Sequence, residues 1–131
     1  MIPATLLPSF ISTTITLPHG QPWKPAEGRW FVISAYFPYS LPTSDAANWA
    51  FHQDLRRRIR KDFPDAAMEE VKGTSADCSW QELSWAVEAS RGPSEQQAIG
   101  LGRLFCQWAI FSVDSDAGMV SKRLINCWGE P

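Results

Sequence analysis

The chain has 131 residues and a mass of 14.7 kDa, which suits one domain rather than two. Its residues are 44% hydrophobic and 12% aromatic with a formal net charge of −2, which disfavours intrinsic disorder and general nucleic-acid binding. No apolar run approaches the roughly 20 residues that span a bilayer, and the proline-broken start lacks the positive region of a signal peptide. We therefore expect a single cytoplasmic domain over residues 1–131, with no membrane partner.

The cysteine and histidine pattern offers no metal site. Cys78, Cys106 and Cys127 are odd in number and share no C-x-x-C spacing, which argues against a disulfide framework or a zinc site. The two histidines, His19 and His52, are isolated, and no H-E-x-x-H or complete calcium loop occurs. The sequence predicts neither a metal nor a cofactor.

Residues 1–28 are predicted to form an N-terminal arm, because five of the ten prolines fall there. One β-branched run, over residues 12–17, predicts a single strand in this arm. The α+β core is predicted to follow over residues 29–127. It begins with the nearly all-apolar strand 29–37, which we expect to be covered on both faces and to end at Pro38.

Two helices are predicted in the core. The first spans 45–63 after a cap at Ser44 or Asp45, and the second spans 95–108 after a Ser94/Gln97 capping box. Hydrophobic residues recur every four positions along the first helix and predict one buried stripe, formed by Ala47, Phe51, Leu55, Ile59 and Phe63. Gly100 and Gly102 resemble a fragment of a phosphate-binding loop, but inside a helix they indicate close packing against the sheet.

The remaining segments predict strands over 69–74, 80–89, 109–113 and 119–127. The 80–89 strand alternates, with Leu83, Trp85 and Val87 on one face and Glu82, Ser84 and Ala86 on the other. The order β-β-α-β-β-α-β-β favours an α+β fold with a mostly antiparallel sheet of five to six strands and both helices on one face. Its inner part has a ferredoxin-like order.

Several polar residues stand where apolar ones would be expected. Glu82 and Ser84 share one face of an apolar strand, and Asn48 lies in the first turns of the first helix. Arg103 and Gln107 stand four residues apart, which places them on one side of the predicted second helix. These five residues form the candidate ligand site, with Glu82 as acid or base and Arg103 holding an anionic substrate; a structural polar network is the alternative.

Four segments of the chain resemble the bacterial domain-of-unknown-function family 3293. They are the Trp30–Ser40 stretch WFVISAYFPYS, Ala47-Asn48-Trp49, the Trp-x-Glu-x-Ser pattern at residues 80–84, and Leu101-Gly102 followed by Phe105–Ile110. The resemblance covers about residues 10–115 and departs at Phe37, where the family usually has Asn. It implies a bacterial or phage α+β domain and points to Asn48, Glu82, Ser84 and Gln107, but it implies no reaction.

Three functions remain open from the sequence. The favoured one is a non-catalytic protein that binds another protein as a regulator or inhibitor, because seven tryptophans are many and exposed Trp is common at interface hot spots. The candidate partner-binding residues are Trp23, Trp49, Trp85 and Trp128. The alternative is a small-molecule-binding module or small enzyme at the candidate ligand site. The third is weak nucleic-acid binding through the basic run Arg56–Lys61, which as a helix face is better explained by solvation.

Overall fold

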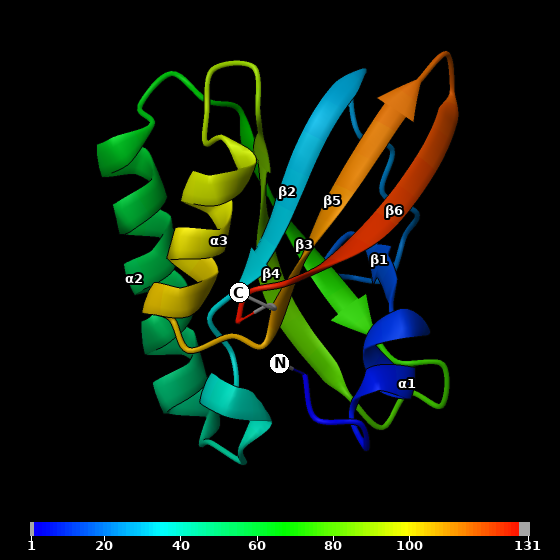
Figure 1. The fold of residues 1–131 in the computed structure, drawn as a ribbon, viewed down its shortest axis with the longest axis vertical. Coiled ribbons are helices and arrows are strands. Elements are labelled where there is room, and N and C mark those ends of the chain that lie inside the picture. The colour runs from blue at the N-terminus through cyan, green and yellow to red at the C-terminus, as the bar shows by residue number, and fades with distance from the viewer. Residues whose placement is uncertain (1, 129–131) are drawn as a thin grey trace.

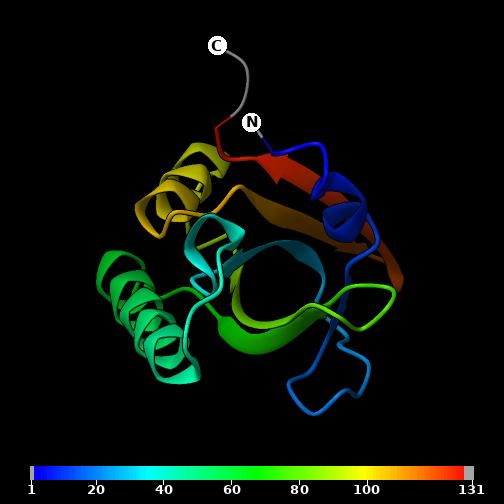
Figure 2. The same cartoon turned by 90° about the horizontal axis from the view of Figure 1, so that it is seen from below.

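Six antiparallel strands form one curled sheet in the computed structural model, which describes residues 2–128. The strands are β1 (Thr14–Thr16), β2 (Gly28–Ser34), β3 (Met68–Thr74), β4 (Gln81–Glu88), β5 (Ala109–Asp116) and β6 (Met119–Asn126), in the spatial order β1-β3-β4-β2-β5-β6. Figure 2 shows the sheet curling into a half-barrel. The predicted α+β class and antiparallel sheet are confirmed, while the ferredoxin-like order stays a prediction.

Two long helices, α2 (Asp45–Asp62) and α3 (Glu95–Leu104), lie against the outer face of the curl (Figure 1). Each begins where the sequence predicts it. The Ser44 side chain accepts a hydrogen bond from the Ala47 backbone, and Ser94 and Gln97 form the reciprocal capping box. These bonds satisfy backbone N–H groups that the first helical turn leaves without a partner.

Alternating side chains divide the core between the two faces of the sheet. On the outer face, Phe31 and Ile33 of β2 pack with Leu55 and Ile59 of α2. On the inner face, Trp30 and Val32 pack with neighbours from the other central strands, Val71, Ala86 and Val113. The expectation that this strand is covered on both faces is therefore confirmed.

The buried stripe of α2 is rotated from the predicted one. Leu55 and Ile59 are buried as expected, but the fully buried positions nearer the N-terminus are the polar Asn48 and His52. Ala47, Phe51 and Phe63 are only partly buried. Polar side chains replace apolar ones at these two positions because each has a hydrogen-bond partner, Phe37 N–H for Asn48 and the Glu70 carboxyl for His52, which periodicity of hydrophobicity cannot reveal.

Two predicted elements end early. The second helix stops at Leu104 rather than at residue 108, since Cys106 has a left-handed backbone with φ 57° and turns the chain. Strand β2 stops at Ser34 rather than at residue 37. The segment after it contains Phe37, Tyr39 and Ser40, all with φ between 48° and 59°. Such conformations are costly for residues other than glycine and persist only where the surroundings hold them.

The N-terminal arm contains a short helix that the sequence analysis does not predict, α1 (Leu7–Ile11). It lies beside the open side of the curl, between β1 and β6 (Figure 2). The segment just after α1 is hydrogen-bonded to the β3–β4 loop on one side and to β6 on the other. The Ser12 hydroxyl accepts a hydrogen bond from the Ala76 backbone, and the Thr13 carbonyl accepts one from the Lys122 ammonium. The strand of this arm is shorter than predicted and pairs with β3.

A membrane-spanning helix is not found within residues 2–128, because none of the helices there is both long and apolar enough.

Candidate functional site

A cavity opens inside the curl at one end of the sheet, where the inner-facing side chains are small. Register explains its position: Gly73 of β3 lies opposite Glu82 of β4, and Ser34 of β2 lies opposite Ser84. At the other end of the curl the bulky Trp30 fills the interior instead. The lining consists of Leu6, Ser9, Phe10, Thr13, Ile15, Val32, Ser34, Ser40, Gly73, Trp80, Glu82, Ser84, Ala109 and Phe111.

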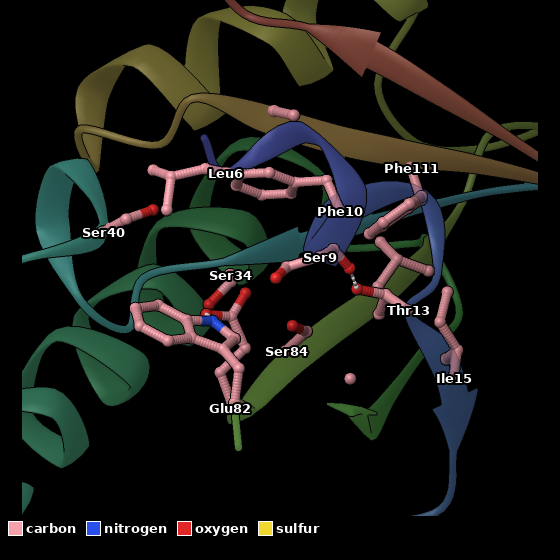
Figure 3. Close-up of a pocket in the computed structure, with 14 residues that line it drawn as sticks. Leu6, Ser9, Phe10, Thr13, Ile15, Ser34, Ser40, Glu82, Ser84 and Phe111 are labelled. Carbon is pink, nitrogen blue, oxygen red and sulfur yellow. Dashed lines mark hydrogen bonds between the residues drawn. The ribbon is translucent and has the colours of Figure 1, made fainter. Parts of the chain in front are cut away.

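Figure 3 shows Ser34, Glu82 and Ser84 close together on the central strands, with Ser9 and Thr13 of the N-terminal arm on another side of the cavity. The volume open to the centre of a water-sized sphere is about 50 Å³. One water molecule needs roughly 10–15 Å³ on this measure, so the cavity has room for about three to five. This is enough for a compact organic group.

Glu82 is the one ionisable residue of this lining. Protein surrounds its carboxyl group, and this desolvation raises the pKa of Glu82 from 4.5 to about 7, while contacts with Trp80 and Ser34 act in the opposite direction. The Trp80 indole donates a hydrogen bond of 3.0 Å to Oε2. Near neutral pH this carboxyl group is therefore poised either to accept or to donate a proton.

Ser84 contributes a hydroxyl that the protein leaves available. The residue is 4% exposed, lines the cavity, and makes no side-chain hydrogen bond within residues 2–128. The hydroxyl of Ser34, which faces it across the strand pair, is instead engaged. It donates to the Leu83 carbonyl (3.2 Å) and accepts from the Tyr36 backbone (3.0 Å). The Ser84 hydroxyl borders the cavity, where a ligand can supply its hydrogen-bond partner.

Asn48 holds the left-handed segment that forms one wall of the cavity. Its Oδ1 accepts a hydrogen bond from the Phe37 backbone at 2.9 Å, and its Nδ2 donates to the Thr43 carbonyl at 3.3 Å. The Phe37 ring packs 4.7 Å from the Trp80 ring, and Trp80 in turn donates to Glu82. Asn48 therefore does not contact Glu82 itself. It holds Phe37, whose ring packs against Trp80, and Trp80 is the hydrogen-bond donor to Glu82.

Asn48→Ala is expected to destabilise the fold by about 2 kcal/mol, because it leaves the Phe37 N–H without its partner in a protein interior. Urea unfolding measures the loss. The neighbouring Trp49→Ala is the matched control, since Trp49 is 51% exposed and its removal should cost about 0.5 kcal/mol or less. Equal stability of the Asn48→Ala variant and the wild type would contradict this role.

Gln107 holds the same segment from the other side. Its Nε2 donates to the carbonyl of Tyr36 at 3.0 Å, and the preceding residue, Cys106, accepts from the Tyr39 backbone at 2.6 Å. Arg103 is not part of the cavity. It donates to the Cys127 carbonyl, and its guanidinium lies 5.5 Å from the Trp128 ring. The two residues separate because α3 ends between them, so Arg103 is not placed to hold a substrate near Glu82.

The four candidate tryptophans do not form one surface. Trp85 is 7% exposed and donates to the His52 carbonyl, so it is part of the outer-face core. Trp23 packs edge-on against Trp30 and donates to Glu69. Trp128 donates to the Gln107 carbonyl, which leaves Trp49, on α2, as the candidate with a largely exposed side chain.

His52 is the main buried polar residue that the sequence analysis does not place in the core. Its ring stacks on Trp85 at 4.5 Å, and its Nε2 lies 2.7 Å from Oε2 of Glu70, while Nδ1 is buried without a hydrogen-bond partner. Burial lowers the pKa of His52, and Glu70 opposes that shift. His52 packs on the outer face, across the sheet from the cavity.

Most of the basic run is engaged on the surface of α2. Arg57 pairs with Asp54, Arg58 pairs with Asp62 at 2.7 Å, and Arg56 lies over the Trp85 ring. No group of three or more potential metal ligands gathers within residues 2–128, and all three cysteines are free thiols.

The lining residues of the N-terminal arm were also missed by sequence reasoning. Leu6, Ser9, Phe10 and Thr13 complete the cavity, although the arm was expected to contribute only a strand. A hydrophobic pattern of Leu6, Leu7, Phe10 and Ile11 is the signal that could have revealed the helix, but Pro8 obscures it. Pro8 is compatible with α1 because it occupies the first turn, where its missing N–H needs no partner.

Comparison with known proteins identifies one family. The family model described as "Protein of unknown function (DUF3293)" matches residues 33–110. No curated protein sequence matches. A solved structure described as a phage SAM lyase in complex with S-methyl-5'-thioadenosine aligns with 82% of this chain and 98% of its own, at 14% identity and a TM-score of 0.36. A score this low carries no argument about fold or function.

Proposed function

Because the chain belongs to the DUF3293 family, whose description assigns no activity, we propose from the site alone that it binds a small organic molecule inside its curled sheet. The observation that carries this proposal is the desolvated carboxyl group of Glu82 beside the Ser84 hydroxyl, to which no residue within 2–128 hydrogen-bonds, in a cavity with room for a compact ligand. Proteins place few polar groups in otherwise apolar pockets, and those groups orient the ligand.

Glu82 would also allow acid–base catalysis in this binding site. A carboxyl group with a pKa of about 7 is populated in both protonation states at neutral pH, which suits general acid or base catalysis. The same group would serve a binding module by recognising a hydrogen-bond donor. The proposal therefore covers a ligand-binding module and a small acid–base enzyme, and Glu82 makes the ligand contact in both.

Binding of a protein partner stays a second proposal, and the observation that favours it is Trp49. This side chain is 51% exposed on α2, and large exposed aromatic residues are common at the centres of protein interfaces. Trp85, buried under the same helix, does not add to such a surface.

Native mass spectrometry of the protein purified from a lysate of its source distinguishes the two proposals. A bound small molecule adds a mass far below that of a protein, and we expect Ser84→Ala and Glu82→Gln to lose it. Ser112→Ala is the matched control, because the Ser112 hydroxyl likewise has no hydrogen-bond partner among residues 2–128 but lies outside the cavity lining. This variant should retain the added mass.

A different pattern would support the second proposal. If the added mass is that of a protein, and Trp49→Ala removes it while Ser84→Ala retains it, the α2 surface is the functional one. An unmodified 14.7 kDa species in every sample would contradict stable binding of either kind.

A further inference from the structure

The charged residues in and around the cavity limit which ligands it can bind. Glu82 is its one ionisable lining residue, so the site carries a negative charge when Glu82 is ionised, and no lining residue can carry a positive charge. A cation that contacts the lining is Lys122. Its ammonium is bound to the Thr13 carbonyl and lies 4.9 Å from the Phe111 ring. An anionic ligand would therefore face a carboxyl group without a free cation to compensate it, which is strongly unfavourable in an enclosed site.

Most of the hydrogen-bonding positions that the cavity offers to a ligand are acceptors. A carboxylate can accept about four hydrogen bonds, and within the described chain the Trp80 indole is the donor that reaches Glu82 with good geometry. The Ser84 hydroxyl adds a further acceptor, since no side chain or backbone group in the described part of the chain hydrogen-bonds to it. The group that complements both side chains is a donor with several N–H bonds.

The apolar part of the lining suits the body of such a ligand. Phe10 and Phe111 contribute aromatic rings and Ile15 contributes aliphatic surface (Figure 3). Trp80 and Val32 also belong to the lining. Aromatic rings attract cations as well as apolar groups. The small volume favours a compact branched chain over a large ring system.

We infer that the ligand enters this cavity as an organic cation with N–H donors, a primary amine on a compact apolar body, whose ammonium group is bound between Glu82 and Ser84. The inference rests on the proposed function, because it names the ligand class for the same cavity. It replaces the anionic substrate that the sequence suggested through Arg103, which the structure places elsewhere.

Three probes of equal branching test the ligand class: isobutylamine, isobutanol and isobutyrate, each titrated at pH 7.5 into ¹⁵N-labelled protein. The indole N–H resonance of Trp80 reports the site, because this N–H donates to Glu82; a Trp80→Phe variant assigns it. We expect isobutylamine to bind about tenfold more tightly than isobutanol, as hydrogen bonds to charged groups are stronger, and isobutyrate not to bind. Glu82→Gln should abolish this preference, while Ser112→Ala should leave it unchanged.

The possible failures are distinguishable. If isobutanol or isobutyrate binds as tightly as the amine, the ligand class is wrong, although the cavity still binds small molecules. The same conclusion follows if Glu82→Gln, with its other indole resonances unchanged, still prefers the amine. If no probe moves the Trp80 resonance at millimolar concentration, both this inference and the proposed function are contradicted.

Discussion

Glu82→Gln is expected to stabilise the fold at pH 8 by up to about 3 kcal/mol and to have little effect at pH 4. The folded-state pKa of Glu82 is raised to about 7 by burial, against an ordinary value of 4.5. Between these two values the unfolded chain loses its proton while the folded protein keeps it. Stability of the wild type therefore falls as pH rises from 4.5 to 7, and glutamine, which does not ionise, removes that part of the fall.

Urea unfolding of wild type and variant between pH 4 and 8.5 measures this difference. Glu69→Gln is the matched control, because Glu69 also accepts a hydrogen bond from an indole, that of Trp23, but is exposed to solvent. Its stability difference from wild type should vary much less with pH. A Glu82→Gln curve that stays parallel to wild type would mean that the carboxyl group is better hydrated than the cavity geometry indicates.

Gly102→Ala is expected to destabilise the fold by about 2 kcal/mol, whereas Gly100→Ala, one half-turn away, should stabilise it by up to about 1 kcal/mol. A Cβ at residue 102 would lie 2.5 Å from Sγ of Cys127 and 2.9 Å from Cγ2 of Ile110, both buried under α3. A Cβ at residue 100 meets no atom within 4 Å. Only the helix preference for alanine over glycine then acts at residue 100.

Thermal or urea unfolding of the two variants measures both effects. Adding Cys127→Ala to Gly102→Ala removes the sulfur that the new methyl group would strike, so the combined loss should be smaller than the sum of the two single losses. Strict additivity, or a Gly102→Ala variant as stable as Gly100→Ala, would show that the helix moves away from the sheet at little cost.

Local signals in the sequence predicted most of the fold. The capping residues Ser44 and Ser94 located both long helices, and the alternation around Glu82 and Ser84 placed these residues on the face that forms the cavity. These signals are reliable because each depends on neighbours within a few positions. The packing role expected for both helical glycines is confirmed for Gly102, by its contact distances to β5 and to Cys127, but is wrong for Gly100, where a Cβ would meet no atom within 4 Å.

What the sequence did not predict depends on contacts between distant segments. Arg103 and Gln107 were expected on one helix face, but the left-handed turn at Cys106 sends them to different neighbours. His52 is buried because it stacks on Trp85 and faces Glu70, and hydrophobic periodicity treats a histidine as polar. The lining from the N-terminal arm depends on α1 reaching the open side of the curl.

The residues that line the cavity come partly from the segment that matches the family model and partly from outside it. Half of its lining residues, including Glu82 and Ser84, fall within the matched residues 33–110; the other half, including all four from the arm around α1, fall outside. Glu82 and Ser84 therefore belong to a different part of the sequence from the N-terminal residues that face them across the cavity. Under the proposed binding function, replacing residues 2–13 would alter one side of the cavity and leave both of these side chains in place.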